Sequence, residues 1–217
     1  MIVIFDWDGT LCDSIEQIVN AMQAASAELS LPPPAATDIR DIVGLGLPQA
    51  VSQLFPELDE ATGRALAQAY SSHYSAPERP PTPLFAGAME TLLALRERGF
   101  ELAVATGKSR RGLDRVMAEV GLDGFFEVTR CADETRSKPH PQMVLDIMAH
   151  RGKTPDDALV VGDTEYDLAM ARRARVRSVG VSFGVHSRAR LAAHQPLAII
   201  DALPRLLDLA ALGGGAG

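Results

Sequence analysis

The chain has 217 residues, of which 47% are hydrophobic and 5% aromatic, and its 21 Lys and Arg against 28 Asp and Glu give a formal net charge of −7. This length fits one domain or one domain with a modest insertion, and the hydrophobic share suffices for a buried core, which excludes a disordered chain. An acidic chain without a basic block lacks the face that sequence-independent nucleic-acid binding requires, so no nucleic-acid partner is expected. An anionic substrate would need a local positive centre, such as a metal ion.

The sequence shows neither a membrane span nor a secretion signal. No apolar run reaches the roughly 18 residues of a membrane helix, so no membrane partner is expected. The apolar run after Met1 has no basic residue before it and is followed directly by a carboxylate, which is unlike a signal peptide, so we expect a cytoplasmic protein. Cys12 and Cys131 show no metal-ligand spacing and are expected to be reduced thiols.

The first predicted element is a strand over residues 2–5, and the elements that follow it are helical. From about residue 14 to 76 the sequence contains no convincing strand, only helical patterns over 15–29, 49–55 and 59–74. Three prolines at 32–34 and four more between 77 and 83 interrupt these patterns, because proline cannot continue a helix. We interpret residues 14–81 as a small α-helical domain inserted into a core formed by residues 1–13 and 82–217.

The rest of the chain alternates between short apolar runs and amphipathic helical stretches. The predicted elements are, in order, helix 87–98, strand 102–105, helix 109–120, strand 126–129, helix 141–150, strand 158–161, helix 166–174, strand 178–181 and strand 197–200. The glycine-rich end, 213–217, is expected to be a frayed tail. The alternation predicts an α/β fold, in which helices cover both faces of a Rossmann-like parallel sheet.

The strongest functional signal is a pair of carboxylates directly after the first strand. Asp6 and Asp8 lie two residues apart in the segment Asp6-Trp7-Asp8-Gly9-Thr10-Leu11. Ligands of an open parallel sheet bind beyond the carboxyl ends of its strands, and two carboxylates there repel each other unless a cation or a proton lies between them. A polar turn that merely closes the strand is the alternative, but four specified positions after an apolar run make it an incomplete explanation.

Three further strand ends carry residues suited to an anionic ligand and a metal. Asp163 follows strand 158–161 and adds a third carboxylate to the sheet edge, which favours a hard cation such as Mg²⁺. Asp167, in the first helical turn after it, is as well explained by helix capping as by chemistry. Thr106 and Gly107 precede a helix and suit a phosphate oxygen, although a threonine there is more often a helix cap. Lys138, between Ser137 and Pro139, is held in a stiff loop.

Taken in this order, these motifs resemble those of the haloacid dehalogenase-like hydrolase superfamily, specifically its phosphatases of the phosphoglycolate phosphatase type. The resemblance covers nearly the whole chain and rests on four segments: 6–14, Thr106-Gly107, Lys138-Pro139 and 162–167. It implies a phosphatase that acts on a small phosphorylated metabolite, with phosphoglycolate as the first candidate. The inserted helical domain would then be a mobile cap over the active site.

The resemblance also implies a role for each residue. Asp6 would be the nucleophile that forms an aspartyl phosphate, and Asp8 would protonate the leaving group and later activate water. Mg²⁺ would be held by Asp6, Asp163 and the backbone carbonyl of Asp8. The phosphate oxygens would be bound by Thr106, Gly107 and Lys138, and Asp167 would orient Lys138 or a metal-bound water.

Two features of the cap are candidates for substrate contact or hinge motion: Arg40 and the turn Gly44-Leu45-Gly46-Leu47. For Arg40, ordinary packing at a helix end is an equal alternative.

The chain departs from the family pattern at two positions. Gly107 stands where relatives often have asparagine, so a side-chain contact is missing, and Arg175 stands near a helix end where relatives often have glycine, which implies an unusual turn. A sugar phosphomutase on the same fold is the nearest alternative, although Thr10 favours a phosphatase. A dehalogenase is disfavoured because Asp8 has no role in the displacement of a halide from carbon. A non-catalytic phosphate-binding protein is the remaining alternative. The sequence leaves open a monomer or a homodimer.

Overall fold

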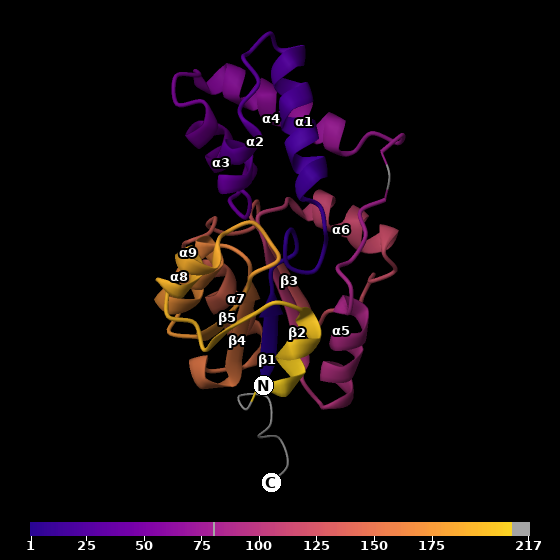
Figure 1. Cartoon of the computed structure of the whole chain (residues 1–217), viewed down its shortest axis with the longest axis vertical. Coiled ribbons are helices and arrows are strands. Elements are labelled where there is room, and N and C mark those ends of the chain that lie inside the picture. The colour runs from indigo at the N-terminus through magenta and orange to yellow at the C-terminus, as the bar shows by residue number, and fades with distance from the viewer. Residues whose placement is uncertain (80, 210–217) are drawn as a thin grey trace.

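The computed structural model describes residues 1–79 and 81–209, and six strands in it form one parallel sheet (Figure 1). The strands are β1 (Ile2–Phe5), β2 (Glu101–Thr106), β3 (Val128–Cys131), β4 (Ala158–Gly162), β5 (Arg177–Val181) and β6 (Ala198–Ile200). Their order across the sheet is β3-β2-β1-β4-β5-β6. Because β1 is central and the strand order reverses beside it, ligands are expected beyond the carboxyl ends of β1, β2 and β4.

Alternate strand residues face two separate hydrophobic clusters, one on each side of the sheet. On one side, Val3 and Phe5 contact a cluster that includes residues of α5 (Ala88–Glu97), α6 (Arg110–Glu119) and the 3₁₀ helix η2 (Leu203–Asp208). On the other side, Ile2 and Ile4 contact α7 (Gln142–Arg151) and α8 (Glu165–Arg173). Two short helices, η1 (Pro155–Asp157) and α9 (Arg188–Ala192), complete this part. The expected α/β fold, a parallel sheet covered by helices on both faces, is confirmed.

Four helices between β1 and α5 lie above the carboxyl ends of the strands in Figure 1, and we call them the cap segment. They are α1 (Ile15–Glu28), α2 (Ala36–Asp41), α3 (Leu47–Leu54) and α4 (Glu60–Tyr74). The chain leaves the sheet and returns to it through two adjacent connections, since the Asp13 N–H donates to the Pro83 carbonyl and the Phe85 N–H donates to the Leu11 carbonyl, both at 2.9 Å. The domain boundaries 14–81 stay a prediction.

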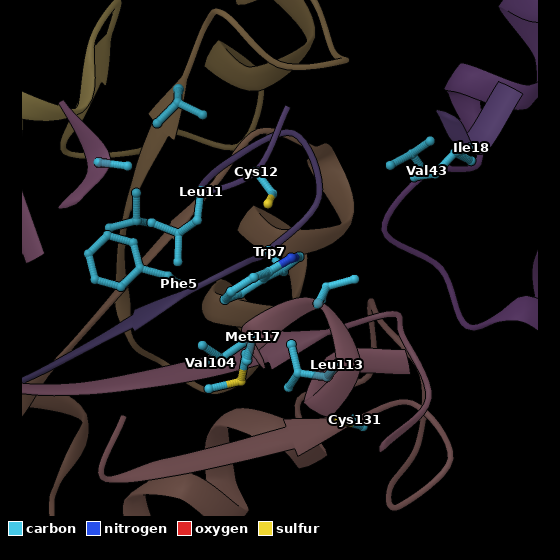
Figure 2. Packing of buried hydrophobic residues seen from close by; sticks show 14 of the residues in the cluster. Phe5, Trp7, Leu11, Cys12, Ile18, Val43, Val104, Leu113, Met117 and Cys131 are labelled. Carbon is cyan, nitrogen blue, oxygen red and sulfur yellow. The ribbon is translucent and has the colours of Figure 1, made fainter. Parts of the chain in front are cut away.

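The hydrophobic cluster on the α5 and α6 side continues from the sheet into the cap segment. Trp7 is completely buried among Val104, Leu113 and Met117, as Figure 2 shows. The same cluster includes residues of the cap segment such as Ile18, Val43 and Leu66. The position of the cap segment is therefore stabilised in part by apolar burial.

The structure corrects several expected elements. The strand expected at 126–129 lies at Val128–Cys131, because Phe125 and Phe126 pack edge to face before the strand begins. The helices at Ala36–Asp41 and Arg188–Ala192 were not expected. The unusual turn expected at Arg175 is confirmed by its positive φ of 61°. The expected tail at 213–217 lies outside the described residues. Among the described residues, no helix is long and apolar enough to span a membrane.

Candidate active site

Three carboxylates come together at the carboxyl edge of the sheet. Asp6 follows β1, Asp163 follows β4, and Asp167 lies in the first turn of α8. One oxygen from each side chain lies within 4.8 Å of the others, and all three residues are buried. The Asp6 N–H donates to the Val161 carbonyl at 2.9 Å, which continues the pairing of β1 with β4 and sets Asp6 beside Asp163.

Glycines make this close approach of carboxylates possible. A Cβ at Gly9 or at Gly184 would lie 2.2 Å from an atom of the Asp163 side chain, and a Cβ at Gly162 would lie 2.4 Å from the Asp167 side chain. Gly9 also has a φ of 77°, a conformation that glycine adopts without strain. The glycine that follows Asp8 in the motif is therefore required by the position of Asp163.

Asp6 has one carboxylate oxygen in contact with donors and one without a partner. Its Oδ1 accepts a hydrogen bond from the Trp7 N–H at 2.6 Å and lies 2.7 Å from Nζ of Lys138. Its Oδ2 is buried and has no hydrogen-bond partner among the described residues. Burial raises the pKa of Asp6 well above its usual range, and the nearby Asp167 and Asp163 raise it further, whereas Lys138 lowers it.

Lys138 is completely buried between two of the carboxylates. Its Nζ lies 2.7 Å from Asp6 Oδ1 and 2.7 Å from Asp167 Oδ1. Burial alone would lower the pKa of the ammonium group, but Asp167 and Asp6 outweigh that effect and raise it above its usual value. Lys138 is therefore a fixed positive charge at the centre of the site.

Asp167 forms both a helix-capping contact and an ion pair. Its Oδ2 accepts hydrogen bonds from the backbone N–H of Thr164 at 3.1 Å and from the Thr164 hydroxyl at 2.7 Å, which closes a capping box at the start of α8. Its Oδ1 contacts Lys138. Both oxygens therefore contact other groups of the chain, one at the helix cap and one at Lys138.

Asp163 is held by two donors and keeps its carboxylate at the edge of the sheet. The Thr10 hydroxyl donates to its Oδ1 at 2.8 Å, and the Val185 N–H donates to its Oδ2 at 2.9 Å. Burial, with the charge of Asp167 added, raises the pKa of Asp163 to about 7. Thr10, which the sequence analysis used only to weigh a phosphatase against a mutase, thus positions a carboxylate.

The residues present fit a divalent cation with oxygen ligands. The unpartnered Oδ2 of Asp6 lies in a group of three carboxylates that faces a single ammonium group, so the site holds more negative than positive charge. Mg²⁺ prefers such oxygen ligands. The Asp8 side chain is not part of this group.

The Asp8 side chain has a different set of partners, and the sequence analysis missed one of them, Lys108, together with Tyr74 beside it. Its Oδ1 accepts a hydrogen bond from the Ser14 hydroxyl and lies 3.0 Å from Nζ of Lys108. Lys108 also donates to the Tyr74 hydroxyl at 3.0 Å. The available signal for Lys108 was its position directly after Thr106 and Gly107, whereas Tyr74 lies in the cap segment and carried none.

Thr106 and Gly107 lie at the end of β2, where the cap segment reaches the site. Thr106 is completely buried, and its hydroxyl oxygen accepts the Lys108 N–H at 3.2 Å, which leaves the hydroxyl proton for another acceptor. A Cβ at Gly107 would lie 2.5 Å from the Leu45 carbonyl oxygen and 2.7 Å from the Gly44 carbonyl oxygen. The departure from asparagine at Gly107 therefore has a steric reason: the backbone of the cap turn occupies the space of a side chain.

The turn formed by residues 44–47 contacts the sheet edge, whereas Arg40 does not. The Gly46 N–H donates to the Ser137 hydroxyl at 2.7 Å, next to Lys138. Arg40 instead forms a partly exposed ion pair with Glu16 inside the cap segment. The structure thus brings the turn, and not Arg40, to the sheet edge.

Comparisons with known proteins show that the chain is similar to hydrolases and phosphatases of one family. The model of the haloacid dehalogenase-like hydrolase family matches residues 3–181. The chain is 35% identical over 214 residues to "Probable phosphatase IndB" of Dickeya dadantii, with 96% of this chain and 93% of that protein covered. It is 30% identical over 213 residues to a phosphoglycolate phosphatase of Pseudomonas putida, with 95% and 78% covered.

A solved structure shows the same fold over nearly the same length. The crystal structure of a hydrolase from Pseudomonas syringae superposes with a TM-score of 0.86 at 25% identity and covers 96% of both chains. The family match spans most of the chain and includes the segments that carry Asp6, Thr106 and Asp163. The chain belongs to the haloacid dehalogenase-like hydrolases.

Proposed function

We propose that this enzyme is a Mg²⁺-dependent phosphatase that hydrolyses a small phosphomonoester through an aspartyl-phosphate intermediate, with phosphoglycolate as the first candidate substrate. The observation that carries the proposal is the buried Asp6: its carboxyl group belongs to one cluster with Asp163, its Oδ1 contacts Lys138, and its Oδ2 has no hydrogen-bond partner among the described residues. The relatives named as a phosphatase and as a phosphoglycolate phosphatase support the reaction class.

The binding of the phosphoryl group follows from the donors around Asp6. Lys138 presents its ammonium group 2.7 Å from the nucleophile, and the Thr106 hydroxyl and the backbone of Gly107 lie at the neighbouring strand end. Asp6, Asp163 and the Asp8 carbonyl would hold Mg²⁺, which when bound screens the anionic nucleophile from the anionic substrate and stabilises the charge of the transferring group.

In the first half-reaction a carboxylate oxygen of Asp6 attacks phosphorus while the bond between phosphorus and the ester oxygen breaks. The Asp8 carboxylic acid gives its proton to that ester oxygen, which leaves as an alcohol. In the second half-reaction the Asp8 carboxylate takes a proton from a water molecule, whose oxygen attacks the phosphorus of the acyl phosphate. The Asp6 carboxylate is then released with inorganic phosphate, and Asp8 carries the proton for the next cycle.

The test is release of free phosphate from a panel of phosphomonoesters in the presence of Mg²⁺ and in the presence of a chelator. Asp6→Asn should abolish turnover, whereas Asp13→Asn, the same change at an exposed position of the same segment, should not. Undiminished turnover in Asp6→Asn would refute the role of Asp6. Conversion of a hexose 1-phosphate to its isomer without net phosphate release would instead indicate a mutase.

A further inference from the structure

The C-terminal end of α2 is held against the core by side chains from α8, from α9 and from the loop between β5 and α9 (Figure 1). Arg190 of α9 forms an ion pair with the Asp41 carboxylate, and the Tyr166 hydroxyl of α8 donates to the Asp41 backbone carbonyl at 3.0 Å. His186 accepts the Glu165 N–H at Nδ1, 2.9 Å away, and its Nε2 lies 3.4 Å from the same Asp41 carbonyl. One residue of the cap segment therefore contacts three side chains of the core.

The core side of this contact is continuous with the carboxylate site. The N–H groups of Val185 and His186 donate to the side chain and to the backbone carbonyl of Asp163, at 2.9 and 3.3 Å. Arg190 also pairs with Glu165, in the first turn of α8, at 2.7 Å. The side chains that hold α2 thus project from segments that are themselves fixed at the edge of the sheet.

On the cap side, Asp41 lies close in the chain to the turn that covers the sheet edge. Asp41 is the last residue of α2, and the turn at residues 44–47 follows shortly after it. That turn reaches Ser137 through the Gly46 N–H and lies against Gly107. The contacts that hold Asp41 therefore also set the position of the turn over the strand ends.

The ion pair lies near the surface, where it can break and form again. The side chains of Arg190 and Asp41 are 31% and 44% exposed, so both charges are hydrated when the pair separates. An ion pair of this exposure changes an equilibrium constant by about two- to fivefold, and a hydrogen bond to a carbonyl contributes a similar factor. Such contacts bias the cap segment toward the sheet edge without locking it there.

We propose that Arg190 and Tyr166 are positioning residues that hold Asp41 and form a latch for the cap segment. While the latch is closed, the turn at residues 44–47 covers the strand ends, and its release opens the site for the exchange of substrate and product. The latch is argued from contacts alone, whereas its role in ligand exchange rests on the phosphatase function proposed above. Because the contacts of the latch do not involve the ligand, loosening the latch changes the rates of ligand binding and release together rather than their ratio.

The first experiment measures hydrogen exchange at Gly46, whose N–H bonds to Ser137 across the contact that the latch closes. Asp41→Asn and Tyr166→Phe should each accelerate this exchange about two- to fivefold, and the double variant should exchange faster than either. In the wild type, Gly46 should exchange faster than Val160 in the central strand β4, because the cap segment opens without unfolding of the sheet. Equal exchange at Gly46 and Val160 would overturn the proposal, even if the variants failed to fold.

Matched variants separate the latch from a general effect of charge on the two helices. Asp38→Asn in α2 and Arg188→Gln in α9 change exposed residues of the same helices and should leave exchange at Gly46 unchanged. Arg190→Lys keeps the charge that faces α2, so exchange at Gly46 should be slower in it than in Arg190→Gln. Absence of any acceleration in both latch variants would overturn the proposal, and so would an equal acceleration in the matched controls.

The second experiment follows the exchange of inorganic phosphate between its free and bound states by phosphorus NMR in the presence of Mg²⁺. In Asp41→Asn the rates of binding and release should both rise, by about the factor seen at Gly46, while the dissociation constant stays the same. A changed dissociation constant with an unchanged rate of binding would overturn the role of the latch in ligand exchange. A wild type that binds no phosphate would count against the proposed function, and exchange at Gly46 would still decide whether the latch exists.

Discussion

The contact between the cap turn and Gly107 allows a quantitative prediction for Gly107→Ala. The added Cβ would lie 2.5 Å from the Leu45 carbonyl oxygen, whereas real Cβ contacts do not fall below 3.0 Å, so the turn or β2 must retreat by at least the difference of 0.5 Å. The Gly44 carbonyl oxygen would lie 2.7 Å from the same Cβ, so a movement of the Leu45 carbonyl alone would leave a second short contact. Overpacking of this kind costs about 1–3 kcal/mol.

The expected result is a loss of stability together with a local change at the turn. A loss of about 2 kcal/mol lowers the melting temperature of a chain of this size by about 4–8 °C. Retreat of the turn also lengthens the hydrogen bond from the Gly46 N–H to the Ser137 hydroxyl, which is 2.7 Å long, so exchange of the Gly46 amide hydrogen should accelerate.

The assays are thermal unfolding, hydrogen exchange at Gly46 and the KM for the phosphomonoester. Gly112→Ala is the matched control: its Cβ would lie 3.2 Å from Oγ of Ser109, the N-cap of α6, and 3.9 Å from Cβ of Lys108, so a shift of a few tenths of an ångström is enough, and alanine favours the helix that contains it. If Gly107→Ala kept the melting temperature, the exchange rate and the KM of the parent, the turn would not lie against Gly107 in solution and the steric reasoning would be wrong.

Three other predictions follow from burial and charge. Gly63→Ala in the interior of α4 should stabilise the protein by about 0.5–1 kcal/mol in urea unfolding, because its Cβ would only contact Val51 at 3.7 Å; destabilisation would contradict the open space seen there. Burial raises the pKa values of Cys12 and Cys131 to about 12, so an aromatic disulfide reagent at pH 8 should react with neither thiol until the protein unfolds. The pKa of Asp163 is raised from 3.8 to about 7, so its protonated form stabilises the folded state, and the free energy of unfolding without metal should fall as pH rises from about 4 to 7 and level off above. Excess Mg²⁺ should reverse this fall, and a pH-independent value in chelator would contradict it.

The sheet and the strand-end residues could be predicted because both depend on local pattern. Each of Asp6, Thr106 and Asp163 directly follows or closes a short apolar strand, and parallel strands bring such positions to one edge. The strand at Val128–Cys131 was displaced in the prediction because its interior holds Thr129 and Arg130, so the apolar signal lay earlier, at Phe125 and Phe126.

The contacts across the cap could not be predicted, because they join residues that are distant in the chain. Lys108 and Tyr74 are 34 residues apart, and Gly46 and Ser137 are 91 apart. No periodicity or spacing in either segment indicates the pairing, which depends on how α4 and the cap turn are placed over the sheet edge. For the same reason, Arg40 was a reasonable candidate from the sequence, although its guanidinium group pairs with Glu16.

The single tryptophan of the chain gives the site an intrinsic optical reporter. Trp7 lies between the two motif aspartates, its backbone N–H donates to Asp6, and its indole ring is buried 6.4 Å from the ring of Phe126. Its emission therefore comes from one place in the molecule, the residue that follows Asp6. If the proposed function holds, metal binding, phosphoryl transfer to Asp6 and movement of the cap segment should each change the fluorescence of the unlabelled protein, on the time scale of a single turnover.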